Sequence, residues 1–260
     1  MATPLPQPDF DMAVTLLRGA QHAVAFTGAG ISTPSGIPDF RSPSGLWQQV
    51  DPMEVASIWG FRRDPARFYA WLRPLARDLL RARPNPAHHA LARLEAAGRL
   101  HAVITQNIDG LHQKAGSRRV IEVHGGLEAM VCLDCGWRGD AAAFLTDEFL
   151  HGQALPRCPR CHAVLKPDAT LFGEPLPAEA WRAAQAAIER ADVVLVAGSS
   201  LEVAPAGDLP WQAHRNGAAV IIVNLTPTRL DPLAAAVLRG DVAQLLPQLA
   251  QAVLTPTTKE

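Results

Sequence analysis

Four short apolar runs, each followed at once by a glycine or a side-chain amide, constrain the fold of this chain of 260 residues most strongly. Runs of this length between turn residues are typical of buried strands. A helical pattern at residues 11–20 precedes the first run, and another at 87–97 lies between the first and second runs. Strands that alternate with helices predict an α/β fold: a Rossmann-like, doubly wound parallel sheet that binds ligands at its carboxyl edge. The runs and the residues after them are 23–27 with Gly28, 102–105 with Gln106, 193–197 with Gly198, and 220–223 with Asn224.

The turn after the first run is the first candidate ligand site. Gly28 and Gly30 lack a Cβ and can take positive φ, so backbone N–H groups could approach a pyrophosphate. The full G-x-G-x-x-G pattern fails, because Thr33 stands at the third glycine position and no acidic residue follows at about 20 positions. The turn therefore disfavours a conventional dehydrogenase and is, by itself, equally compatible with an ordinary tight turn.

The four cysteines form two C-x2-C pairs separated by 22 residues: Cys132, Cys135, Cys158 and Cys161. This spacing places four thiolates at tetrahedral corners about 2.3 Å from a zinc ion. Two disulfides would need an oxidising compartment, and residues 1–10 carry neither the basic nor the apolar part of a signal peptide. We predict a closed structural Zn²⁺ site, with Asp134 and His162 at the surface, and no catalytic zinc, which needs an open coordination position.

Composition restricts the partners. The formal charge of -1 gives no general attraction to nucleic acid or anionic membranes, and no apolar stretch reaches about 18 residues. We therefore expect a cytoplasmic protein that binds no nucleic acid and no membrane. The sequence does not determine the oligomeric state, for which a monomer is the working expectation.

Further motifs occur along the chain in a fixed order. They are GAGISTPSGIPDFRSPSGLW, TQNIDGLH, an isolated HG, the two CxxC pairs, KPDATLFGE, GSSLEVAPA and IVNL. In these motifs and their order the chain resembles the sirtuins, NAD-dependent protein-lysine deacylases, and is similar to their bacterial-type single-domain members from about residue 14 to 247. The resemblance implies transfer of an acyl group from lysine to ADP-ribose with release of nicotinamide, NAD as co-substrate, and acylated-lysine proteins or peptides as partners.

Position and resemblance together divide the chain into two domains. A discontinuous NAD-binding domain would comprise residues 1–41, 84–126 and 168–260. A helical insertion, 42–83, and a zinc-ribbon insertion, 127–167, would pack together as a small domain across a cleft. Zinc would order the ribbon, because about forty residues hold too little apolar core to stay folded alone.

The resemblance makes His124, Asn107 and Asp109 the candidate catalytic residues. A lone histidine after a strand is otherwise more often packed or at the surface, but an imidazole pKa near 6.5 suits a general base for a ribose hydroxyl. Asn107 would orient the nicotinamide ribose beside Gln106. Asp109 and Ile108 would hold the carboxamide, which needs an acceptor and a donor. The alternative is a strand-to-helix turn capped by Asn and Asp.

The other candidate NAD contacts are positions that match the family's motifs. Phe40 would cover the reactive ribose and exclude water, unless it is ordinary core. The remaining residues are Gly28, Ala29, Gly30, Ser32, Asp39 and Arg41 in the first loop, and Gly198, Ser199, Ser200, Asn224, Leu225, Asp241 and Val242 on the adenosine side.

Residues 166–174 match the family's peptide-binding segment, where an extended substrate adds itself as a strand between this segment and residues 201–203. The Thr170 carbonyl would accept the acyl-amide N–H, and Phe172 would line the acyl-lysine tunnel. The candidate substrate contacts are Tyr69, Thr170, Phe172, Gly173, Glu174 and Leu201.

One departure bears on the acyl group. Sirtuins that prefer succinyl- and malonyl-lysine carry Tyr-x-x-Arg, whereas here Leu72 stands at the arginine position and Arg73 is about 100° out of register on a helix. An acyl carboxylate would lose water without gaining a cationic partner. We expect a deacetylase that accepts neutral acyl groups and desuccinylates weakly.

Two other functions remain open. A mono-ADP-ribosyltransferase or NAD hydrolase shares the first chemical step. A non-catalytic zinc and NAD binding module is the third reading, against which the intact His124, Asn107 and Asp109 argue.

Overall fold

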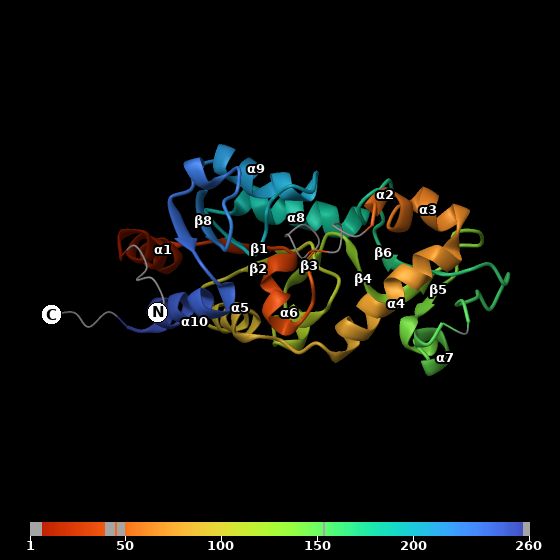
Figure 1. Cartoon of the computed structure of the whole chain (residues 1–260). Coiled ribbons are helices and arrows are strands. Elements are labelled where there is room, and N and C mark those ends of the chain that lie inside the picture. Colours follow the sequence, from red (N-terminus) through yellow and green to blue (C-terminus); the bar gives the residue numbers. More distant parts are fainter. Residues whose placement is uncertain (1–6, 40–44, 46–49, 153, 257–260) are drawn as a thin grey trace.

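The central sheet has six parallel strands (Figure 1) in a computed structural model that describes residues 7–39, 45, 50–152 and 154–256. The strands read β3-β2-β1-β7-β8-β9 across the sheet, which is the doubly wound Rossmann order. The chain reverses its direction of progress between β1 and β7, so a crevice for ligands is expected at the ends of those two strands. The strands are β1 Ala23–Thr27, β2 Ala102–Thr105, β3 Val120–Glu122, β7 Val193–Ala197, β8 Ala219–Asn224 and β9 Ala236–Arg239.

Helices cover both faces of this sheet because its strands are apolar on both sides. Along β1, Ala23 and Ala25 pack toward α1, α5 and α10, while Val24 and Phe26 pack toward α8 and α9. Figure 1 shows α8 and α9 on one side of the strands and α5 and α10 on the other. These helices are α1 Gln7–Gly19, α5 Pro86–Ala96, α8 Ala178–Arg190, α9 Leu209–Arg215 and α10 Val242–Leu254; the short α6 spans Leu111–Lys114.

A second, three-stranded sheet has the order β5-β4-β6, with both strand pairs antiparallel. It lies at the far end of the molecule from α1 and α10, beside α4 (Figure 1). Residues 125–126 and 168–169 belong to its strands, although the predicted boundaries assign them to the larger domain. The elements here are α2 Pro52–Val55, α3 Ile58–Arg63, α4 Pro65–Arg81, β4 Gly125–Val131, β5 Arg138–Asp140, α7 Asp147–Leu150 and β6 Lys166–Ala169.

The two insertions share one apolar core. Phe61 and Phe68 from the helical insertion pack with Met130, Phe149 and Leu165 from the zinc-ribbon insertion. Neither stretch has enough apolar surface to form a core alone, so each completes the other. This confirms the expected packing of one insertion against the other.

The predicted elements are largely confirmed. Three of the four apolar runs match β1, β2 and β7 residue for residue, and the fourth extends to Ala219–Asn224. The first helix begins at Gln7 rather than at residue 11. Strand β9 was not predicted, because its four residues at the sheet edge are only alternately buried. No helix among the described residues has the length and apolarity needed to cross a membrane.

Candidate functional site

Two glycine turns meet at the carboxyl ends of β1 and β7. Gly198 has φ +61°, and a Cβ there would lie 2.2 Å from the Ile31 nitrogen. A Cβ on Gly30 would lie 2.9 Å from the Gly198 carbonyl oxygen. Gly28 has φ −134°, and Gly30 is not among the glycines with positive φ, so the expected use of positive φ at these two positions is wrong. Their missing side chains instead allow two backbones to touch.

The first turn offers backbone amides at the switch point. Its 3₁₀ helix, residues 29–31, starts directly after β1, and the amide groups of Ile31 and Ser32 bond back to Gly28 and Ala29. Among the described residues, the amides of Ala29 and Gly30 have no acceptor. Free N–H groups at the start of a helical turn suit an anion such as a pyrophosphate.

His124 follows β3 and is held by one backbone hydrogen bond. Its Nδ1 lies 2.9 Å from the Gln106 carbonyl oxygen. A carbonyl can only accept, so Nδ1 carries the proton and Nε2 keeps a lone pair. Burial lowers the pKa of His124 below 6.5, opposed by the bond to Gln106. The ring is therefore a neutral base at pH 7.

Asn107 and Gln106 tie β2 to both glycine turns. The Asn107 side-chain nitrogen donates to the Gly28 carbonyl and to the Ser32 hydroxyl, each at 3.1 Å. The Gln106 side chain donates to the Ser199 hydroxyl at 3.0 Å. No described residue donates to the Asn107 amide oxygen, which leaves that oxygen available to a ribose hydroxyl.

Asp109 belongs to a buried network centred on the Ser32 hydroxyl. That hydroxyl donates to the Asp109 carboxylate at 2.7 Å and lies 3.4 Å from Nε2 of His88. The backbone amide of Asn85 donates to Nδ1 of His88, so Nε2 is the protonated nitrogen of that ring. The other Asp109 oxygen accepts from the Leu111 amide at 2.9 Å. The hydroxyl of Ser32 and the carboxylate of Asp109 thus satisfy each other inside the protein.

Two buried histidines, for which the sequence predicted no role, lie beside this network. The rings of His88 and His112 lie 4.9 Å apart, and His112 Nε2 is 2.9 Å from the Thr27 hydroxyl. Burial lowers the pKa of His88 to about 4 and that of His112 to about 3. The sequence offers one weak signal for His88, a histidine at an apolar position of a helical pattern. His112 is the last residue of the TQNIDGLH motif.

The adenosine-side positions differ in what their side chains do. Ser199 is buried and accepts from Gln106, while Leu225 is 70% exposed. Asp241 caps α10 by accepting from the Ala243 amide, and Val242 packs into the core. These two residues therefore have a structural explanation as strong as the predicted NAD contact. Phe40 and Arg41 lie outside the described residues, and Asp39 and Ser200 are half-buried.

The predicted peptide-binding segment runs beside His124, the candidate base. The Thr170 amide donates to the His124 carbonyl at 2.8 Å, and Phe172 exchanges two backbone bonds with Ala56 and Ile58. The backbone carbonyl of Thr170 accepts no bond from the described residues, as the predicted role in holding the acyl amide requires. Across the site, Leu201 is buried with φ +62°, an unusual conformation for a residue with a branched side chain.

Tyr69 does not lie where the predicted substrate contact requires. Its side chain is 0% exposed, and its hydroxyl donates to the Leu165 carbonyl inside the small core. It therefore does not line a substrate pocket, because both its ring and its polar end are used in packing. Leu72 is also buried, and Arg73 donates to the Ala154 carbonyl with its guanidinium 5.2 Å from the Phe149 ring centre.

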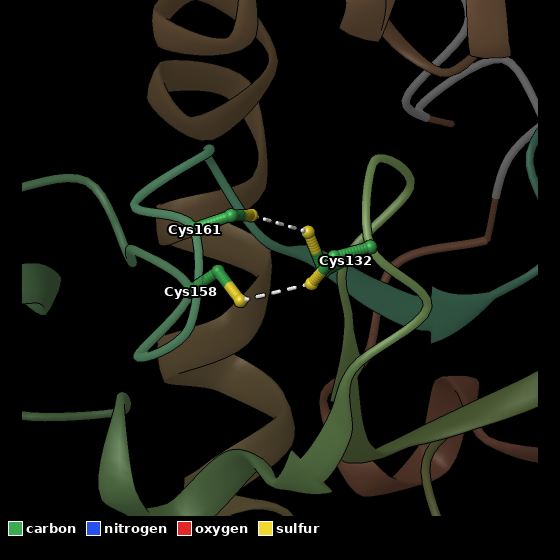
Figure 2. A group of neighbouring side chains, drawn as sticks. Cys132, Cys158 and Cys161 are labelled. Atoms are coloured by element: carbon green, nitrogen blue, oxygen red, sulfur yellow. Dashed lines mark hydrogen bonds between the residues drawn. The ribbon is translucent and has the colours of Figure 1, made fainter.

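The four cysteine sulfurs converge as the spacing predicts. Figure 2 shows two loops that turn their sulfur atoms toward one another. Cys132 and Cys161 lie 3.4 Å apart, Cys135 and Cys158 lie 3.6 Å apart, and all four sulfurs fall within 4.8 Å. A zinc tetrahedron with bonds of about 2.3 Å has edges of about 3.8 Å, so the cluster fits Zn²⁺. The cysteines are free, and Asp134 and His162 are exposed, as predicted.

Comparisons with known proteins agree on one family. The Sir2 family model matches residues 28–205. The chain is 48% identical to NAD-dependent protein deacylase 2 of Archaeoglobus fulgidus, over 93% of this chain and 94% of that protein. A solved Sir2 enzyme matches with a TM-score of 0.89 at 46% identity, over 94% of this chain and 97% of that one. A Sir2 variant solved with deacetylated p53 peptide and 3′-O-acetyl-ADP-ribose matches with a TM-score of 0.87 at 39% identity, over 95% and 97%. The chain belongs to the Sir2 family.

Proposed function

We propose that this protein is an NAD-dependent protein-lysine deacylase that transfers the acyl group to ADP-ribose and releases nicotinamide. The geometry of His124 carries the proposal: the Gln106 carbonyl fixes the proton on Nδ1, and none of the described residues bonds to the lone pair of Nε2. Burial keeps the ring neutral at physiological pH by lowering its pKa. A base in this state can take a proton from a ribose hydroxyl without first losing its own.

The acyl-lysine carbonyl oxygen attacks C1′ of the nicotinamide ribose, and the C1′–N bond to nicotinamide breaks. Nε2 of His124 then takes the proton of a ribose hydroxyl, whose oxygen attacks the acyl carbon and takes over the acyl group. The bond between the acyl carbon and the lysine nitrogen then breaks, and the protonated His124 returns its proton to the leaving amine. Water adds to the acyl carbon, whose bond to the C1′ oxygen breaks, so the acyl group remains on the ribose hydroxyl oxygen. The unpaired amide oxygen of Asn107 would orient the ribose, which is held beside a base rather than left free in solution.

The NAD contacts follow the site's geometry. The amides of Ala29 and Gly30 face the pyrophosphate, Asn107 and Gln106 hold the nicotinamide ribose, and Asp109 with Ile108 holds the carboxamide. Gly198, Ser199, Ser200, Asn224 and Leu225 line the adenosine side. The buried network of Ser32, Asp109 and His88 supports this assignment, because it fixes these groups before a ligand arrives.

The acyl preference is for neutral groups. Arg73 is committed to the Ala154 carbonyl and Phe149, and Leu72 offers no charge, so a succinyl carboxylate would be desolvated without a partner. We propose deacetylation as the main activity, with weak desuccinylation.

The test is mass spectrometry of the protein with NAD and matched acetyl-, butyryl-, myristoyl- and succinyl-lysine peptides. We expect O-acyl-ADP-ribose in equal amount to free lysine, and a loss of roughly 100-fold or more in His124→Ala. His89→Ala is the control, because His89 is exposed on α5. NAD consumption without deacylation would move the assignment to ADP-ribosyl transfer or NAD hydrolysis, and succinyl-lysine as best substrate would contradict the argument from Leu72.

We also propose a reducing compartment, such as the cytoplasm, as the place of action. The four cysteines are free thiols grouped as metal ligands, an arrangement that oxidising compartments do not favour.

A further inference from the structure

A buried ammonium group lies under the peptide-binding segment. Lys166 is 3% exposed, and its Nζ donates to the carbonyls of Pro167 at 2.9 Å and Ala169 at 2.7 Å. Its third partner is the Glu174 carboxylate, at 3.0 Å. An ammonium has three donors, so all of them are satisfied inside the protein. The sequence reasoning assigned no role to Lys166 and placed Glu174 among the substrate contacts.

The Glu174 carboxylate also joins the two ends of residues 166–174, and this closed segment is called the ring below. Glu174 accepts from the Leu171 amide at 2.9 Å, and its own amide donates back to the Leu171 carbonyl at 3.0 Å. Lys166 therefore bonds to the start of the segment, at the carbonyls of Pro167 and Ala169, and pairs with Glu174 at the end of the segment. The turn between them contains Gly173, which has φ +86° and lies against the Trp59 ring.

The ring has two further attachments, one to each neighbouring part of the site. The Thr170 amide bonds to the His124 carbonyl, and Phe172 pairs with Ala56 and Ile58. Among the described residues, the Thr170 carbonyl and both backbone groups of Gly173 have no partner. These are the groups that an added peptide strand can use.

We propose that Lys166 and Glu174 are a positioning pair for the acylated peptide: their ion pair holds the Thr170 carbonyl and the backbone groups of Gly173, which have no partner among the described residues, in register with His124. This inference rests on the proposed deacylase function. Neither residue touches the substrate. Each acts through the loop, whose free groups would otherwise have to be ordered at the moment of binding. A polar pair is needed there because the carbonyls of Pro167 and Ala169 are buried and require donors.

The test compares Lys166→Met, Glu174→Ala and the double variant with the wild-type protein. We expect the KM for an acetyl-lysine peptide to rise roughly tenfold and kcat/KM to fall about 100-fold, while the KM for NAD changes less than about twofold. The double variant should lose little more peptide affinity than either single variant, because both changes break the same Lys166–Glu174 ion pair. Lys166→Arg, which keeps a buried cation and its donors, should restore part of the peptide affinity.

Arg138→Met is the matched control. Arg138, on β5, pairs with Asp168 on β6, the strand of Lys166, but the arginine side chain is 65% exposed and the pair includes neither Lys166 nor Glu174. This variant should keep both KM values. If Lys166→Met folds poorly, Glu174→Ala carries the same comparison, and labelled-peptide binding by anisotropy replaces kinetics.

Two failures are distinguishable. Wild-type protein that forms no O-acyl-ADP-ribose would overturn the proposed function. Active wild-type protein together with pair variants that lose thermal stability but keep the peptide KM, or that raise both KM values alike, would overturn the positioning role alone.

Discussion

At His124 a single hydrogen bond selects the tautomer on which the chemistry depends. The Gln106 carbonyl fixes the proton on Nδ1, and that carbonyl belongs to the residue that also bonds Ser199. The candidate base and the turn that contains Ser199 are thus bonded by the backbone and the side chain of the same residue.

The pH dependence of the reaction follows from the His124 pKa. Burial lowers that pKa below 6.5, so the ring stays neutral to a lower pH than a free imidazole. The acid limb of kcat/KM should therefore have its midpoint below pH 6.5, as measured between pH 5 and 8 with an acetyl-lysine peptide. A midpoint above 6.5 would show that an anionic group stabilises the charged ring.

The buried pair His88 and His112 should make the fold sensitive to acid. Their folded pKa values are about 4 and about 3, depressed by burial from the unfolded value of about 6.5. The unfolded chain therefore binds more protons as pH falls. Stability is complete above pH 6.5 and declines below it, by up to about 1.4 kcal/mol per pH unit for each histidine.

Urea unfolding between pH 7.5 and 5 measures this decline. The slope of the unfolding free energy against pH counts the protons taken up on unfolding. His88→Gln should reduce this count by as much as one. His89→Gln, at the exposed neighbouring position of α5, should leave the slope unchanged. Equal slopes in all three proteins would mean that His88 is protonated in the folded state.

At the scale of elements, the turns after β1 and β7 are built as one unit. Gly198 combines a left-handed backbone with a Cβ position already occupied by the Ile31 nitrogen. The side chains of Asn107 and Gln106 then bond one to each turn. Three strands therefore contribute to a single rigid edge.

Gly198→Ala should destabilise the protein by about 3 kcal/mol or more, because it adds a backbone clash to the cost of a left-handed residue. Gly217→Ala separates the two causes: Gly217 has φ +96° but open space around its Cβ position. It should cost about 1 kcal/mol in urea unfolding. Equal losses of stability in the two variants would mean that the turn after β1 moves to accommodate the added methyl group at residue 198.

At the scale of the whole molecule, the zinc cluster supports the core shared by the two insertions. Cys132 and Cys158 are buried in that core with Phe149 and Leu165. The same region supplies Ala56 and Ile58 to the peptide segment. Order at the cysteines is thus connected to the substrate side of the site by continuous packing.

Removal of zinc with a strong chelator should unfold the small core and abolish deacylation while the large sheet persists. Hydrogen exchange should show lost protection in β4 and β6 and retained protection in β1 and β2, and added Zn²⁺ should restore both protection and activity. Cys158→Ser should reproduce the effect without a chelator. Uniform loss across both sheets would show that the molecule folds as one cooperative unit.

The sequence by itself determined four strands of the large sheet, the glycine turns and the four cysteines, and the resemblance singled out His124 as a candidate base. These features depend on local patterns: short apolar runs, fixed cysteine spacing and motifs of adjacent residues. Buried strands such as β1 and β7 were placed residue for residue because an apolar run ends where its turn begins.

Only the tertiary structure decided the roles that depend on contacts between distant segments. It placed Tyr69 in a core that residues 127–167 complete, and it brought His88 to Ser32 across 56 positions. It also paired Glu174 with the buried Lys166. The physical reason is that a polar side chain takes its role from the partner that satisfies it, and for these residues the fold, not the neighbouring sequence, supplies that partner.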